Sequence, residues 1–317
     1  MGRGIMDDLN LIKIDGKPVE KLLDVISKAV GKIYEPRAIR KEADARAYEI
    51  EVIESAKARA YLNKQEIEQN ALDRIQERTL FREVKKQEHI DAVTRIAIEQ
   101  LQNEKDVSDT PVNEDWTVRF FNIVEDVSDE QMQQLWGKIL AGEVKSPNSY
   151  SIHTLELLKN LSKPEAELFE KAANYSIFGN NAPFVFIGGN NEILQRNHFT
   201  FDERLLLIEL GLIQSETNIA LKYETSLNDV DYIYHSGKYV IKATRKSNSP
   251  KWQFPVLRLT RVGEELIKLL TPIAIDDYIK EFYFYLEKLG LVVEYAFIIS
   301  RDEKSIEHTR PWMKFES

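Results

Sequence analysis

The stretch DEQMQQLWGKILAGE, residues 129–143, gives the clearest structural signal in the chain. Its apolar side chains recur every three or four residues, the spacing that places them on one face of an α-helix: Met132, Leu135, Trp136, Ile139 and Leu140. Ser128 and Gln131 have the spacing of a capping box, and Gly142 is placed to end the helix in the left-handed conformation. We predict that this helix is the centre of a helical bundle, with Trp136 as its apolar anchor.

Helix start signals occur on both sides of this stretch. Asn113 is placed to cap a helix over the residues that follow it, and Ser162 with Glu165 forms a second capping-box pattern. These signals predict a compact helical bundle over residues 106–178. Its large aromatic side chains are interpreted as core, with the alternative that they line a groove for a protein partner or ligand: Trp116, Phe120 and Trp136.

An amphipathic pattern opens the chain, in a predicted N-terminal helix at residues 1–35. Between residues 18 and 34 the apolar side chains share one helical face, and lysines decorate the remainder. We expect this helix to pack on a neighbouring helix or on a second subunit. Peripheral contact of residues 18–34 with an anionic membrane is the less favoured alternative, because Glu20 and Asp24 reduce the positive charge.

Residues 36–105 are predicted to form a long helical arm. No Gly or Pro occurs from residue 37 to residue 103, where Ala, Glu, Arg, Lys, Gln and Ile are abundant. At about 1.5 Å per residue, an unbroken helix would extend on the order of 100 Å. The apolar positions keep no strict heptad repeat, so we expect either one arm or two helices folded back near Asn63 or Asn70. Either form is expected to assemble the chain into a homo-oligomer.

The last part of the chain, residues 179–317, changes to a mixed pattern of strands and helices. FVFIGGNNEIL predicts two short strands about a Gly-Gly-Asn-Asn turn, and Thr200 with Glu203 forms a capping box before FDERLLLIEL. A Ser-Gly turn divides YIYHSGKYVIKATRK into a hairpin, followed by the strand WQFPVLRL and a helix that begins at Thr260. This order of helix, hairpin and helix predicts a winged-helix-like α+β domain.

The segment KYVIKATRKSNSPKWQFPVLRLTR, residues 238–261, contains seven cations and no acidic residue, in a chain of net charge −9. A projecting hairpin would gather them into a positive patch for DNA or RNA, on which aromatic rings could stack. The candidate residues are Lys238, Lys242, Arg245, Lys246, Lys251, Arg258 and Arg261, with the rings of Tyr239 and Trp252. The competing interpretation turns the cations to solvent and the rings to the core.

Composition and motifs exclude several classes of protein. The 317 residues include no Cys, which removes disulfides and thiolate ligands and agrees with a reducing cytoplasm. No stretch approaches the roughly 20 apolar residues of a membrane-spanning helix. The sequence also has no phosphate-binding glycine loop, no nucleophile elbow and no histidine pair with metal-ligand spacing. We therefore predict no catalytic residue, no metal ligand and no cofactor.

Two acidic pairs, Glu125-Asp126 and Asp129-Glu130, offer the oxygen ligands that divalent cations prefer. Both pairs flank predicted helix ends, where a carboxylate near a helix N-terminus is electrostatically favoured. Capping is the favoured interpretation, and a metal-dependent enzyme that uses these acids is kept as an alternative.

Two runs resemble a known family: EDWTVRFFNIVEDVSDEQMQQLWGKILAGEVKSPNSYSIHTLELLKNLSKPEAELF and the upstream KLLDVISKAVGKIYEPRAIRKEADARA. They are similar to the bacterial family catalogued as domain of unknown function 2806. This resemblance implies a bacterial or phage-borne source and supports the domain order, and it transfers no catalytic residue.

The sequence therefore predicts an α+β protein, mostly α, with a helical arm, a helical bundle and a winged-helix-like domain. We expect a cytoplasmic, non-enzymatic interaction protein with a regulatory or sensing role, linked to phage defence or mobile elements. A nucleic-acid-binding regulator that uses residues 238–261 is the first alternative.

Overall fold

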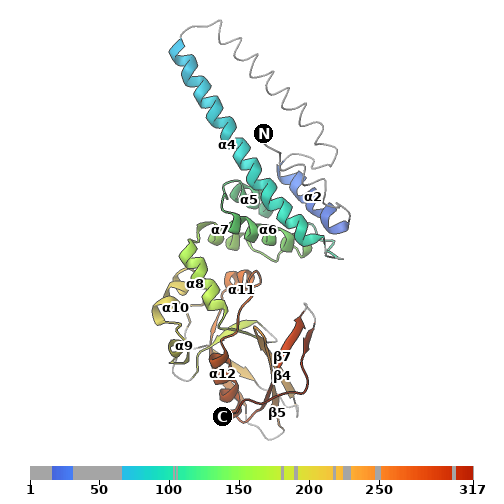
Figure 1. Cartoon of the computed structure of the whole chain (residues 1–317), viewed down its shortest axis with the longest axis vertical. Coiled ribbons are helices and arrows are strands. Elements are labelled where there is room, and N and C mark those ends of the chain that lie inside the picture. Colours follow the sequence, from blue (N-terminus) through green and yellow to red (C-terminus); the bar gives the residue numbers. More distant parts are fainter. Residues whose placement is uncertain are drawn as a thin grey trace. The chain divides into compact units, whose positions relative to one another are not determined.

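Figure 1 shows a computed structural model of the chain. It describes residues 16–30, 66–102, 104, 106–179, 182–188, 192–216, 219–223, 230–246, 251–301 and 305–316. The chain divides into two compact units, unit 1 (Met1–Leu155) and unit 2 (Glu156–Ser317), and each is described by itself. This division lies earlier in the chain than the boundary predicted between residues 178 and 179. Residues 31–65, with about half of the predicted arm and the fold-back near Asn63, lie outside the described residues.

Unit 1 is built from helices. They are α2 (Lys17–Val30), α4 (Glu66–Leu101), α5 (Glu114–Val124), α6 (Glu130–Lys145) and α7 (Ile152–Asn160), the last of which crosses into unit 2. α4 is continuous through Asn70, so the chain does not fold back at that residue. α4 packs mainly on α6, and α2 contacts α4, α5 and α6. Val93 and Ala97 from α4 are fully buried, as are Trp136 and Leu140 from α6, so these two helices form the centre of the core.

The starts of α5 and α6 test two capping predictions. Asn113 caps α5 as predicted, and its Oδ1 accepts a 3.0 Å hydrogen bond from Trp116 N. The predicted cap at Ser128 is wrong, because Asp129 is the N-cap of α6 and accepts a 2.9 Å hydrogen bond from Met132 N. A carboxylate cap also interacts favourably with the helix dipole, which makes Asp129 the stronger cap of the two.

Gly142 does not end α6, contrary to the prediction, and the helix continues to Lys145. A Cβ on Gly142 would lie 2.8 Å from Cε2 of Tyr150, so the glycine makes room for this ring. The neighbouring Glu143 is buried, and its carboxylate accepts hydrogen bonds from the backbone N–H groups of Asn148 at 2.6 Å and Tyr150 at 3.0 Å. Packing and a satisfied buried carboxylate therefore shape this turn.

A second glycine sets the approach of α4 to α6. A Cβ on Gly137 would lie 2.4 Å from Cγ2 of Ile96 and 3.2 Å from the carbonyl oxygen of Val93. A side chain at this position would force the two helices apart, because a packed core does not absorb an added methyl group without strain. Gly137 thus allows the tight α4–α6 contact.

Unit 2 combines helices with antiparallel strands. The strands are β1 (Ser176–Phe178), β2 (Pro183–Phe186), β3 (Ala220–Tyr223), β4 (Val230–Ser236), β5 (Tyr239–Arg245), β6 (Trp252–Arg258), β7 (Val292–Arg301) and β8 (Ile306–His308). The helices are α8 (Lys163–Ala173), α9 (Glu192–Arg196), α10 (Phe201–Glu209), α11 (Arg261–Ile267) and α12 (Asp276–Lys288). The predicted mixture of helix and strand is confirmed.

The strands form an eight-stranded antiparallel sheet with the order β3-β6-β2-β1-β4-β5-β7-β8. The Ser-Gly hairpin is confirmed: Ser236 pairs with Tyr239, and Gly237 in the turn has a φ of 48°. Both strands of this hairpin lie inside the sheet, between β1 and β7, so the hairpin does not project as a wing. The predicted winged-helix-like arrangement is not confirmed.

Other local signals in unit 2 gave mixed results. Ser162, Thr200 and Thr260 cap α8, α10 and α11 as predicted. The second strand predicted in FVFIGGNNEIL is wrong, because residues Glu192–Arg196 form the short helix α9. The apolar pair Ile193 and Leu194 is too short to show a period, so a strand and a helix could not be distinguished from the pattern.

α12 covers one face of the sheet. The ring of Phe282 on α12 lies between 5.1 and 6.1 Å from the rings of Phe184, Phe186 and Tyr234, measured between centroids. The hydroxyl of Tyr278, also on α12, accepts a 2.7 Å hydrogen bond from Phe186 N and donates a 3.0 Å bond to Phe186 O. Aromatic packing and this paired hydrogen bond attach α12 to β2.

Candidate interaction surfaces

The two halves of α4 have opposite environments. From Ile90 onward the helix buries most of its apolar side chains, whereas its first half extends beyond α5 and α6 (Figure 1). That first half exposes five large apolar side chains, and Phe81 has 63% of its surface accessible to solvent. We name these residues the α4 stripe: Leu72, Ile75, Leu80, Phe81 and Val84. At about 100° per residue these side chains are spread around more than half of the helix circumference, with Phe81 and Val84 on the side opposite Leu72 and Ile75. The exposed half of α4 therefore offers apolar contact surface on more than one side.

The charges around the α4 stripe nearly cancel. Between Leu72 and Glu88 the sequence has five cations and four anions. Lys85 and Glu88 form an ion pair at 2.6 Å on this surface, with both side chains about half exposed. A surface with interspersed charges of both signs does not repel a second copy of itself.

α4 is attached to α5 at the point where the helix leaves the core. Lys86 Nζ lies 2.7 Å from a carboxylate oxygen of Glu125, and His89 Nδ1 lies 2.8 Å from the Glu125 carbonyl oxygen. The hydrogen bond to Glu125 raises the pKa of Lys86. These bonds hold the base of the exposed half while the α4 stripe stays accessible.

The acidic pairs considered as metal ligands have structural roles. Glu125 binds Lys86, and Asp129 caps α6. In the described part of the chain, no cluster of three or more His, Cys, Asp or Glu side chains is placed to hold a metal ion. This geometry supports the capping interpretation for Asp129, whereas Glu125, at the C-terminal end of α5, is held by an ion pair and does not cap an N-terminus.

The aromatic candidates of the helical bundle lie in the core of unit 1. Trp116 stacks on Phe120 at a centroid distance of 5.0 Å, and Trp136 meets the edge of Phe120 at 5.6 Å. Trp136 and Phe120 are fully buried, and Trp116 is only 3% exposed. The three rings therefore pack against one another instead of forming an open groove.

The amphipathic helix α2 buries its apolar face within unit 1. Val19, Leu22 and Ile26 are buried where α2 packs on α4, α5 and α6. The same face is therefore not available to enter a membrane surface at residues 18–30. Among the described helices, none has both the length and the apolar character needed to cross a bilayer.

In the described part of the chain, at least four of the seven candidate cations of residues 238–261 lie within ion-pair distance of carboxylates. The pairs are Lys238 with Asp276 at 3.0 Å, Lys242 with Glu294 at 2.8 Å, Arg258 with Glu264 at 3.4 Å and Arg261 with Glu265 at 2.8 Å. The hydrogen bond between Lys238 and Asp276 raises the pKa of the lysine and lowers that of the carboxyl. The local excess of positive charge is thus reduced by acids from other parts of the sequence.

The remaining candidates of this segment occupy different environments. Arg245 ends β5, Lys246 follows it, and Lys251 precedes β6. Tyr239 and Trp252 are each 4% exposed, so their rings are packed and do not offer a stacking face to nucleic acid. The structure therefore brings neither these aromatic rings nor all seven cations to one surface.

A cavity in unit 2 is lined by residues that the sequence analysis did not single out, with the exception of Arg258. Its tyrosines come from β3 and β4, namely Tyr223, Tyr232 and Tyr234. Tyr232 and Tyr234 alternate in YIYH, which indicates that they share one face of β4. No local pattern indicates that Tyr223 on β3 lies opposite them. The cavity could therefore not be found from sequence spacing.

Fold and surfaces define an α+β protein with a helical unit, whose longest helix exposes an apolar stripe, and a unit built on an antiparallel sheet. Residues 73–283 match the sequence profile of the family described as "Protein of unknown function (DUF2806)". The chain belongs to this family, as the resemblance predicted. No curated protein and no solved structure matches the chain significantly.

Proposed function

We propose that this protein is a non-enzymatic bacterial interaction protein that self-associates through the α4 stripe. The observation that supports the proposal is the exposure of five large apolar side chains on one half of a helix whose other half is core. Water-exposed apolar surface is costly to maintain, and association removes it from water. The proposal includes two further predictions, namely that the chain has a long helical arm and that the protein is cytoplasmic.

The proposed occupant of the stripe is a second copy of the chain. The near balance of cations and anions between Leu72 and Glu88 supports self-pairing, because two copies of a single-sign surface would repel. The described α4 has 36 residues, which corresponds to a length of about 54 Å at 1.5 Å per residue. This length provides a contact site away from the core around Trp136.

The experiment compares the full-length protein with Phe81→Glu by multi-angle light scattering at micromolar concentration. The parent should be an oligomer, and the variant should dissociate at least tenfold more readily, equivalent to about 1.4 kcal/mol. Val118→Glu is the matched control, because Val118 is also apolar and 43% exposed but lies on α5. Point changes are preferred to deleting α4, which would remove Val93 and Ile96 from the core.

Two results would contradict the proposal. One is a monomeric parent protein at micromolar concentration. The other is a variant that keeps the parent's mass although Phe81→Glu places a charge on the most exposed apolar side chain of the stripe. Circular dichroism of each variant reports whether the fold is kept, since an exposed substitution should change stability by less than about 0.5 kcal/mol.

A regulatory or sensing role in phage defence or in a mobile element is the biological part of the proposal. It rests on the bacterial or phage-borne source that the family resemblance implies. Comparing plaque formation on bacteria with and without the gene tests it; equal plating of all phages tried would argue against a defence role.

The alternatives receive less support. A nucleic-acid regulator with a winged-helix-like domain required a projecting hairpin and exposed rings, whereas β4 and β5 are interior strands and Trp252 is buried. A metal-dependent enzyme would use the pairs Glu125-Asp126 and Asp129-Glu130, but Glu125 pairs with Lys86 and Asp129 caps α6.

A further inference from the structure

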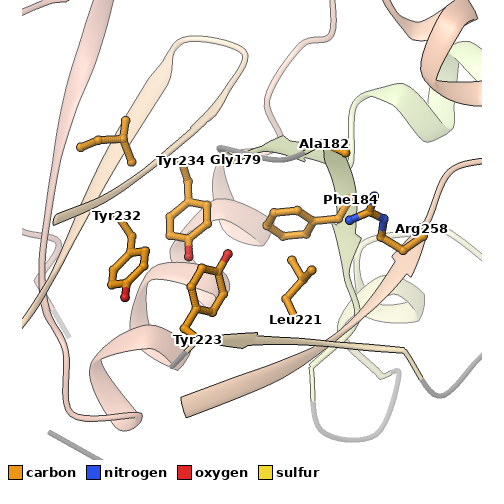
Figure 2. Close-up of a pocket in the computed structure, with 9 residues that line it drawn as sticks. Gly179, Ala182, Phe184, Leu221, Tyr223, Tyr232, Tyr234 and Arg258 are labelled. Atoms are coloured by element: carbon orange, nitrogen blue, oxygen red, sulfur yellow. The ribbon is translucent and has the colours of Figure 1, made fainter. Parts of the chain in front are cut away.

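The sheet of unit 2 curls around a cavity of about 210 Å³ (Figure 2). Tyr223 on β3 and Tyr232 on β4 lie only 4.9 Å apart between ring centroids. The strands β6, β2 and β1 separate β3 from β4 in the sheet, so this contact requires a strong curl. The cavity lies inside the curl and is independent of the α4 stripe.

The walls of the cavity are flat and apolar in the middle. Tyr223 stacks on Trp252 at a centroid distance of 4.0 Å with an interplanar angle of 10°, which gives the tyrosine a rigid backing. Figure 2 shows the side chains of Leu221 and Phe184 between the tyrosines and Arg258. A cavity of about 150 Å³ holds benzene, so 210 Å³ is sufficient for a single aromatic ring with small substituents.

One end of the cavity carries the buried hydroxyl of Tyr234, which faces the Tyr223 hydroxyl but does not meet hydrogen-bond geometry with it. Tyr234 is 1% exposed, and in the described part of the chain its hydroxyl makes no hydrogen bond. The hydroxyls of Tyr234 and Tyr223 point toward one another at this end of the cavity (Figure 2). Burial, with a smaller effect of Tyr223, raises the pKa of Tyr234, so its hydroxyl stays protonated and can donate. Buried polar groups without a partner are uncommon, and a ligand acceptor would satisfy this one.

The opposite end carries a cation. Arg258 lines the cavity from β6, and its Nη2 contacts Glu264 at 3.4 Å, near the upper limit for a hydrogen bond. A guanidinium has five N–H donors in a planar fork that matches a carboxylate. Within the described residues, the contact with Glu264 is the one hydrogen bond of this guanidinium, so donors remain for a ligand.

We propose that this cavity binds a small aromatic carboxylate with one ring and with an oxygen acceptor opposite the carboxylate. The carboxylate contacts Arg258, the ring lies against Tyr223, Leu221 and Phe184, and the far oxygen accepts from the Tyr234 hydroxyl. Along the cavity, a cation is followed by an apolar wall and then by a hydroxyl. A ligand with a polar group at each end of one ring matches this order.

The test measures binding to the full-length protein by titration calorimetry with three probes. 4-Hydroxybenzoate has both polar ends, benzoate lacks the far oxygen, and 4-hydroxybenzamide lacks the negative charge. We expect 4-hydroxybenzoate to bind with a stoichiometry of one per chain and each of the other probes to bind at least tenfold more weakly.

Two variants assign the ends of the ligand. Tyr234→Phe should abolish the preference for 4-hydroxybenzoate over benzoate, and Arg258→Gln should abolish the preference for the acid over the amide. Tyr295→Phe is the matched control, because Tyr295 belongs to the same sheet but lies outside the cavity lining, and this variant should bind like the parent.

Three outcomes would overturn the proposal. The first is the absence of binding by all three probes at millimolar concentration. The second is tighter binding of the amide, which would indicate a neutral ring as the ligand. The third is a Tyr234→Phe variant that melts like the parent and still prefers 4-hydroxybenzoate over benzoate. Its melting temperature is an informative control for folding, because the Tyr234 hydroxyl has no partner that meets hydrogen-bond geometry.

Discussion

Each unit of the protein contains a dense aromatic cluster, and the two clusters differ in what adjoins them. In unit 1, Trp116, Phe120 and Trp136 pack on one another among buried aliphatic side chains. In unit 2, Tyr223 and Tyr234 pack in a similar density of rings but also line a cavity. Aromatic content alone therefore does not distinguish a core from a binding site.

An unpartnered polar atom does not distinguish them either. Trp136 Nε1 and the Tyr234 hydroxyl are both buried without a hydrogen-bond partner in the described part of the chain. The Tyr234 hydroxyl lies at a cavity that a ligand can fill, and the guanidinium of Arg258 lines the same cavity (Figure 2). The combination of an unpaired donor, free volume and a charge is the feature that identifies a candidate site.

The largest expected effect tests whether the cluster of unit 1 is purely structural. Trp136→Ala should lower the free energy of unfolding by about 3–5 kcal/mol, because it removes a fully buried indole and leaves a cavity. Urea denaturation followed by circular dichroism measures the change, with Val118→Ala as an exposed control. If Trp136→Ala unfolds like the parent, the aromatic cluster of unit 1 is not the structural core that we infer.

A smaller effect should separate two buried tyrosines within unit 2. Tyr278→Phe should cost about 1–3 kcal/mol, because it leaves the buried N–H of Phe186 without its partner. Tyr234→Phe should cost close to nothing without a ligand, because its hydroxyl makes no hydrogen bond. Thermal unfolding of the two variants side by side provides the measurement. Equal destabilisation would mean that the Tyr234 hydroxyl is satisfied in the free protein.

The most gradual effect concerns pH and belongs to unit 2. Burial, with a further contribution from Arg301, lowers the pKa of His235 to about 4, below its value of about 6.5 in an unfolded chain. Between these values the unfolded state binds the proton more readily, so stability should fall as pH decreases from about 6.5 to about 4. One proton gives a slope of at most about 1.4 kcal/mol per pH unit.

His235→Gln is the control for the pH effect. Denaturation midpoints of parent and variant should converge as the pH decreases, since the variant lacks the titrating ring that stacks on Phe178 at 4.9 Å. Parallel pH profiles for the two proteins would show that another group causes any acid sensitivity.

Signals carried by neighbouring residues were predictable from the sequence. The caps at Asn113, Ser162, Thr200 and Thr260 depend on a side chain and a backbone N–H three residues later. The Ser-Gly hairpin likewise depends on a turn of two residues. These features were correctly placed because their energy comes from contacts within one turn of chain.

Features that depend on distant partners were not predictable in this way. Lys238 and Lys242 looked like part of a free basic patch, although Asp276 and Glu294 lie beside them in the fold. Gly142 looked like a helix terminator because its role, making room for Tyr150, depends on how the chain returns. The cavity depends on the curl of the whole sheet, and no period or motif in the sequence encodes that curl locally.

The strand order of unit 2 has a consequence for synthesis on the ribosome. β2 finds its partner β6 more than sixty residues later in the chain, and β5 pairs with β7 only after α12 has been made. Such pairings must close long loops before they gain any stability. The sheet therefore cannot be completed until nearly the whole chain has emerged, whereas the residues of unit 1 are available to fold once its last residue, Leu155, is clear of the exit tunnel. During translation the helical unit is therefore complete before the sheet unit. The outer edges of β1 and β2 stay unpaired until the strands that pair with them have been made.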